Sequence, residues 1–212
     1  MPESSIVQGP PPPPIERGWG GDRAPDGPGS SGSSRRASFI GLILLLVSSS
    51  AVFVAFTAAL AMRRDIATDW VSIHKPPILW LNSGLLLASS VMLELARRTL
   101  RSGKRSGFNR WWTAGTAFGV LFLAGQWLAW QQLREAGLYM ASNISSAFFY
   151  ILTAVHAAHL IGALVALIYV DVGALRFRLG PSKRTAIDIS AVFWHFLDVL
   201  WVLLMVVFYV LD

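Results

Sequence analysis

Five segments of the chain are apolar over about 20 residues, the length that an α-helix needs to cross a bilayer. They are residues 39–62, 77–97, 111–132, 146–170 and 186–210. Charged residues make up only 14% of the 212-residue chain, whereas a soluble domain carries about 25%. Because short loops join the segments, the sequence predicts an all-α fold, a polytopic membrane bundle of five transmembrane helices with antiparallel neighbours.

Residues 1–36 differ in composition from the rest of the chain, because they are rich in Pro, Gly and Ser and include the run Pro10 to Pro14. Such a segment has little apolar surface to bury, so we expect a disordered cytoplasmic tail followed by a transmembrane domain at 37–212. The first apolar segment exceeds the roughly 7–15 residues of a signal sequence. We therefore expect it to be a membrane span that is retained.

Lys and Arg are unevenly distributed between the two sides of the predicted bundle. Most of the 18 lie in the tail, in the loop after the second span and in the loop after the fourth. The opposite side has only Arg63, Arg64, Lys75 and Arg134. Because basic residues collect in cytoplasmic loops, the distribution predicts an amino terminus inside and a carboxyl terminus outside. The net charge of +6 fits this asymmetry without a nucleic-acid partner.

Four polar side chains lie deep in the last two predicted spans. His156 and His159 share one face of the fourth span, and His195 and Asp198 share one face of the fifth. At about 1.5 Å per residue, the two pairs sit at similar depths. Because polar groups in hydrocarbon are costly, the sequence predicts a buried polar cluster of these four residues between neighbouring helices.

Glu94 belongs to a polar stripe with Ser83 and Ser90 on the second span, near its inner end. Arg97 and Arg98 follow at the i+3 and i+4 positions, so one interpretation is an intrahelical ion pair. The other is that Glu94 faces a partner subunit, a lipid headgroup or a proton route.

Three histidines and one carboxylate are ligand types that zinc or iron accepts, so a metalloenzyme is one hypothesis. Against it, the chain has no Glu-x-x-His repeat for a di-iron site. It has no Cys, no nucleotide-binding loop and no Gly-x-Ser-x-Gly motif. A free-standing small transporter is a second hypothesis, although no half-repeat or broken helix is evident.

Four stretches, in order along the chain, resemble motifs of one family, subunit III of haem–copper terminal oxidases in its five-helix form. They are residues 89–94 (SSVMLE), similar to the stretch around that family's membrane glutamate, 126–131 (QWLAWQ), 156–162 (HAAHLIG) and 194–201 (WHFLDVLW). Ala157 stands where the family's His-Gly-x-His signature has glycine. The five-helix form lacks two amino-terminal helices, which form one wall of the family's phospholipid cleft.

The resemblance implies a subunit without catalytic residues, a metal or a haem of its own, within an oxidase complex of the cell inner (plasma) membrane. Haem and copper are then expected in its partner, the proton-pumping catalytic subunit I, which it stabilises and whose proton uptake it supports; subunit II completes the complex. Bound phospholipid is also implied. The electron donor is open, because five-helix members also occur in quinol oxidases and beside nitric oxide reductases.

Overall fold

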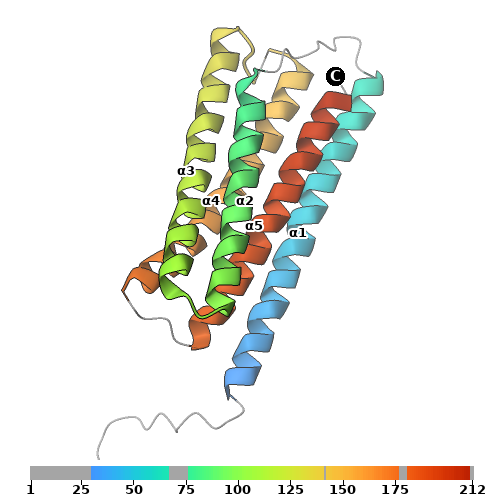
Figure 1. Cartoon of the computed structure of the whole chain (residues 1–212). Coiled ribbons are helices and arrows are strands. Elements are labelled where there is room, and N and C mark those ends of the chain that lie inside the picture. The colour runs from blue at the N-terminus through green and yellow to red at the C-terminus, as the bar shows by residue number, and fades with distance from the viewer. Residues whose placement is uncertain (1–29, 67–75, 141, 177–180, 211–212) are drawn as a thin grey trace, which may run out of the picture.

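The computed structural model describes residues 30–66, 76–140, 142–176 and 181–210, and every regular element in these ranges is a helix. The helices are α1 (Ser30–Ile66), α2 (Ile78–Arg101), α3 (Arg105–Glu135), α4 (Ile144–Leu175) and α5 (Pro181–Val210). They run alternately up and down (Figure 1). The prediction of an all-α bundle of five helices is confirmed. Most of the predicted tail, residues 1–29, lies outside the described residues, and α1 begins seven residues before the predicted transmembrane domain.

Four of the five helices are long and apolar enough to cross a membrane: α1, α2, α4 and α5. Helix α3 is long enough at 31 residues. Its apolar character is diluted by glycine, threonine, tryptophan and Gln126, so the composition of α3 alone does not qualify it as a span. The axis of α3 is nevertheless aligned with the axes of the other helices in the bundle (Figure 1).

Helices α2 to α5 pack in chain order, and three further contacts join helices that are not consecutive in the chain: α2 with α5, α1 with α5 and α1 with α4. Helix α2 packs on α3, α3 on α4 and α4 on α5, while α5 also packs on α2 and on α1. In Figure 1, α2 and α5 lie side by side at the front, α4 lies behind them, and α1 and α3 form the two edges. Helix α1 contacts α4 and α5, and only 17% of its apolar stretch is buried, the smallest share among the four helices that are apolar enough to cross a membrane.

Helices α2 and α3 approach closely because glycines of α3 face α2. A Cβ atom on Gly115 would lie 2.9 Å from the side chain of Leu93, and one on Gly125 would collide with the side chain of Asn82. Because Gly115 has no side chain, α2 comes close enough for Ser89 Oγ to donate a hydrogen bond of 2.7 Å to the carbonyl oxygen of Gly115. Small residues at a helix interface give the same close packing in membrane bundles generally.

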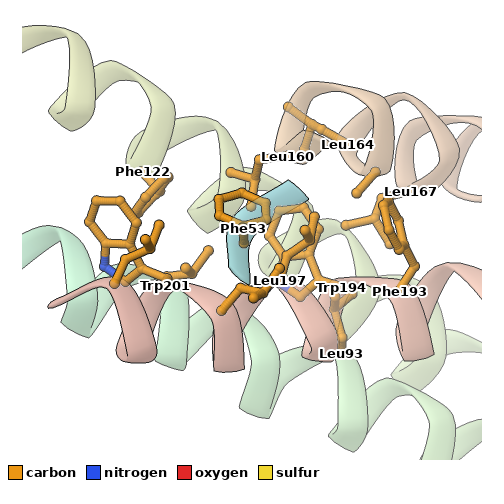
Figure 2. Close-up of a cluster of buried hydrophobic side chains, with 14 of the residues drawn as sticks. Phe53, Leu93, Phe122, Leu160, Leu164, Leu167, Phe193, Trp194, Leu197 and Trp201 are labelled. Atoms are coloured by element: carbon orange, nitrogen blue, oxygen red, sulfur yellow. The ribbon is translucent and has the colours of Figure 1, made fainter. Parts of the chain in front are cut away.

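Large side chains of α5 fill the centre of the bundle. Trp194 and Trp201 are 0% and 1% exposed. Figure 2 shows them pointing with Leu197 toward Phe122 and Leu160 of the neighbouring helices. The ring of Trp201 meets that of Phe122 edge-on, with the centroids 5.0 Å apart. This aromatic layer fixes which faces of α3, α4 and α5 meet, and so it positions the polar residues beside it.

Candidate functional site

His156 of α4 is fully buried and surrounded by aromatic rings from three other helices. The centroid of its imidazole lies 5.0 Å from that of Trp201, 6.1 Å from that of Phe122 and 6.2 Å from that of Phe53. Neither of its ring nitrogens has a hydrogen-bond partner among the described residues. His156 therefore lies in an aromatic cage.

His159 lies one turn further along α4 and is only partly buried. Its Nδ1 atom is 2.8 Å from the carbonyl oxygen of Val155, to which it donates a hydrogen bond because a carbonyl oxygen only accepts. Its ring contacts the ring of Phe53, with the centroids 5.7 Å apart. Both histidines of α4 thus contact the same phenylalanine of α1.

His195 and Asp198 of α5 face α2. The Nδ1 atom of His195 forms a hydrogen bond with Ser90 Oγ of α2. The nearest carboxylate oxygen of Asp198 is 4.0 Å from the same nitrogen, which is longer than a hydrogen bond. Asp198 is 5% exposed, and neither of its oxygens has a hydrogen-bond partner in the described chain.

The four predicted cluster residues thus lie in two groups, one beside α1 and one beside α2. Trp201 lies between α4 and α2, because its ring packs on His156 while its Nε1 atom donates a hydrogen bond of 2.9 Å to Ser83 Oγ. No hydrogen bond between described residues joins His156 or His159 of α4 to His195 or Asp198 of α5. A single functional cluster of these residues stays a prediction.

Glu94 forms the ion pairs that its spacing predicts. Its two carboxylate oxygens each lie 3.2 Å from a guanidinium nitrogen, one of Arg97 and one of Arg98. Arg97 also reaches across to α5, where it lies 3.1 Å from an oxygen of Asp188. The sequence interpretation missed Asp188, although it precedes His195 by two helical turns and so shares its face of α5.

Two buried amide side chains lie outside the predicted cluster, and the sequence placed Gln126 only within the 126–131 motif. Asn82 of α2 is 0% exposed and Gln126 of α3 is 2% exposed. All four of their side-chain polar atoms lack a hydrogen-bond partner among the described residues. Asn82 packs on the bare backbone of Gly125, so this amide lies at the close interface between α2 and α3.

The geometry does not support nucleophilic chemistry. In a Ser–His–Asp triad the serine and the carboxylate address opposite nitrogens of the imidazole. Here Ser90 and Asp198 both face Nδ1 of His195. Within the described ranges no three His, Cys, Asp or Glu side chains are grouped to hold a metal ion. The polar residues instead bridge helices, as in the contact from Ser90 to His195 and the ion pair from Arg97 to Asp188.

This combination of long apolar helices and polar bridges between them defines a polytopic helical membrane protein. The family profile described as cytochrome c oxidase subunit III matches residues 32–212. The chain therefore belongs to the cytochrome c oxidase subunit III family, whose members are subunits of terminal oxidases, and the resemblance inferred from the four motifs is confirmed.

Relatives of the same name occur in several bacteria. The chain is 30% identical to cytochrome c oxidase subunit 3 of Synechocystis sp. over 179 residues, which is 81% of this chain and 74% of the relative. It is 27% identical to the protein of that name from Thermostichus vulcanus, over 82% of this chain and 87% of the relative. The Corynebacterium diphtheriae protein is 29% identical over 60% of this chain and 62% of the relative.

Proposed function

We propose that this chain is the accessory, non-redox subunit of a proton-pumping haem–copper terminal oxidase, and that it stabilises the catalytic subunit I during aerobic electron transport. The observation that carries the proposal is the family match over residues 32–212, together with the helix-bridging role of the polar residues. Family membership counts against a free-standing transporter and against a metalloenzyme.

In this proposal α3 is the fifth transmembrane span, because it lies parallel to α2 and packs along it (Figure 1). The amino terminus lies on the cytoplasmic side of the plasma membrane and the carboxyl terminus on the outside. The basic residues at one end of the bundle support this orientation. They include Arg98, Arg101, Lys104, Arg105 and Arg184.

Support of proton uptake is the second part of the proposal. The ion pairs of Glu94, Arg97 and Asp188 lie at the proposed cytoplasmic ends of α2 and α5, where the carboxylates are about one-third exposed. Partly exposed carboxylates can exchange protons with water near the membrane surface. The roles of Glu94 in a proton route, in contacts to lipid and in contacts to a partner remain alternatives within this proposal.

Removal of the chain tests the accessory role. Membranes of cells that lack this chain are compared with membranes of cells complemented with it, and haem content and oxygen consumption over many turnovers are measured. We expect the haem-bearing subunit to remain partly assembled without the chain but to lose activity faster during turnover. Equal haem content and equal activity over time in the two membranes would contradict the proposal.

A further inference from the structure

Gln126 of α3 and His156 of α4 are polar side chains deep in the bundle that no protein group satisfies. They are 2% and 0% exposed. Neither the two amide atoms of Gln126 nor the two ring nitrogens of His156 have a hydrogen-bond partner among the described residues. A buried polar atom without a hydrogen bond is costly, above all where no bulk water can reach it. These four atoms therefore need a partner.

The two side chains lie at the same level of the interface between α3 and α4. Trp130 Nε1 donates a hydrogen bond of 3.1 Å to Thr153 Oγ1, which shows where the two helices are level. Gln126 precedes Trp130 by four residues, and His156 follows Thr153 by three. Since α3 and α4 run in opposite directions, both residues lie about one helical turn from this bond and on the same side of it (Figure 1).

Helical spacing also turns Gln126 toward α4. Phe122 and Trp130 lie four residues before and after Gln126, and residues four apart share a face of a helix. Both of these side chains contact α4. The ring of Phe122 lies 6.1 Å from that of His156 between centroids, and Trp130 bonds to Thr153. Gln126 thus lies between two side chains of α3 that reach α4 on either side of it.

The polar side chains beside this pair are already occupied. Trp201, whose ring packs on His156, donates its N–H to Ser83. Thr153 accepts a hydrogen bond from the indole of α3 and donates one of 2.7 Å to the carbonyl oxygen of Phe149. The other rings of the aromatic cage are phenylalanines, which have no polar atom. The unpaired atoms of Gln126 and His156 are left with each other or with a bound molecule.

The chemistry of the two groups favours water as that molecule. An amide offers both donors and an acceptor, and a neutral imidazole offers one of each. A molecule between them must therefore donate and accept, and it must be small because aromatic rings of three helices surround His156. Buried waters typically make about three hydrogen bonds to polar groups that the protein leaves unpaired. The flexible side chain of Gln126 can turn to admit one such molecule.

We propose that Gln126 and His156 form a buried water site between α3 and α4, in which one bound water molecule joins the amide to the imidazole. The site goes beyond the proposed function and does not depend on it, because it uses only side chains of this chain. It gives His156 a part in holding α4 against α3, in addition to the ring contacts of the aromatic cage.

Radiolytic footprinting detects water inside a protein. A pulse of X-rays converts water to hydroxyl radicals, which oxidise the side chains next to each bound molecule, and mass spectrometry locates the oxidised residues. Trp201 is the reporter because it packs on His156. Trp112 is the matched control, because it is as deeply buried but donates its N–H to the carbonyl oxygen of Leu167 at 3.1 Å. In the protein purified with its native partners, we expect oxidation of Trp201 and almost none of Trp112.

Two glutamine variants link this signal to the site. Gln126→Leu removes one end of the bridge, whereas Gln132→Leu changes an exposed glutamine of the same helix. We expect Gln126→Leu to lower the oxidation of Trp201 to the level of Trp112, and Gln132→Leu to leave it unchanged. If Gln126→Leu does not fold, His156→Phe takes its place, because it keeps a ring in the cage. Equal oxidation of the two tryptophans in the unaltered protein, or oxidation of Trp201 that persists without Gln126, would overturn the site.

A double-mutant cycle separates a water bridge from a direct bond. Gln126→Leu and His156→Phe are made singly and together, and unfolding by SDS is measured. Because the two side chains share one water, the second substitution should cost less than the first, with a coupling of about five-fold or more in the unfolding equilibrium. The matched cycle of Gln126→Leu with Trp112→Phe should be additive, since these residues lie about 21 Å apart along α3.

The two experiments together decide the outcome. Coupling in the first cycle with oxidation of Trp201 supports the water site. Additive effects in that cycle would overturn it. Coupling without oxidation of Trp201 would mean that the amide and the imidazole bond to each other directly, and this would overturn the water site as well.

Discussion

Replacement of Gly119 by alanine tests the packing that brings α3, α4 and α5 together. The new Cβ atom would lie 2.5 Å from Cη2 of Trp194 and 3.3 Å from Cδ1 of Leu164. Carbon atoms in contact are about 3.5–4.0 Å apart, so the indole ring would have to move by about 1 Å. Trp194 is fully buried, and its neighbours must therefore move with it.

The free energy of this change has two terms of opposite sign. Forcing a methyl group into a well-packed core costs about 1–3 kcal/mol. Replacing glycine by alanine inside a helix recovers about 1 kcal/mol. Gly162→Ala is the matched control, because it gains the same helical preference with no described atom near the new methyl group. The difference between the two variants isolates the packing term.

The assay is unfolding of each variant in mixed micelles by increasing SDS, followed through the fluorescence of the nine tryptophans. We expect Gly119→Ala to be about 1–3 kcal/mol less stable than Gly162→Ala, a difference of about five-fold to more than a hundred-fold in the unfolding equilibrium. Equal midpoints for the two variants, or a higher midpoint for Gly119→Ala, would refute the close approach of α3 to Trp194.

Three further substitutions test individual polar residues. Asp198→Ala is expected to lower the yield of assembled complex more than the turnover per haem, because the carboxyl group is buried inside the bundle, 4.0 Å from Nδ1 of His195; normal yield with lost electron transfer would contradict this. Glu94→Gln is expected to give normal haem content and at most a modest change in turnover, and complete loss of oxygen reduction in the assembled complex would argue against a supporting role. Trp201→Phe keeps the ring packing but removes the donor to Ser83, and should cost about 1 kcal/mol in the SDS assay; an unchanged midpoint would count against that bond.

The helices themselves could be predicted from the sequence because each bilayer-length apolar run leaves the backbone one way to satisfy its hydrogen bonds. The membrane character of α3 was harder to judge from composition. Its glycines lower the hydropathy, yet Gly115, Gly119 and Gly125 lie where α2 or Trp194 approaches most closely. Residues that make α3 look less like a span are thus the ones that pack it into the bundle.

The site was predicted less completely, because depth along a helix says nothing about rotation around its axis. The pair His156 and His159 and the pair His195 and Asp198 were expected to lie at similar depths in one buried cluster. In the structure the aromatic layer turns α5 so that Trp201 faces His156, while His195 faces Ser90. The ion pairs of Glu94 followed from local spacing, whereas the pairing of Arg97 with Asp188 requires knowing that α2 contacts α5.

The most direct test of the account is to isolate this chain from its native membrane and ask what comes with it. The membranes are solubilised mildly, the tagged chain is purified, and its optical spectrum and metal content are recorded. The account predicts a stoichiometric haem-bearing subunit and the absorption bands of an oxidase. A colourless chain purified alone, or one that itself holds stoichiometric iron or zinc, would contradict it.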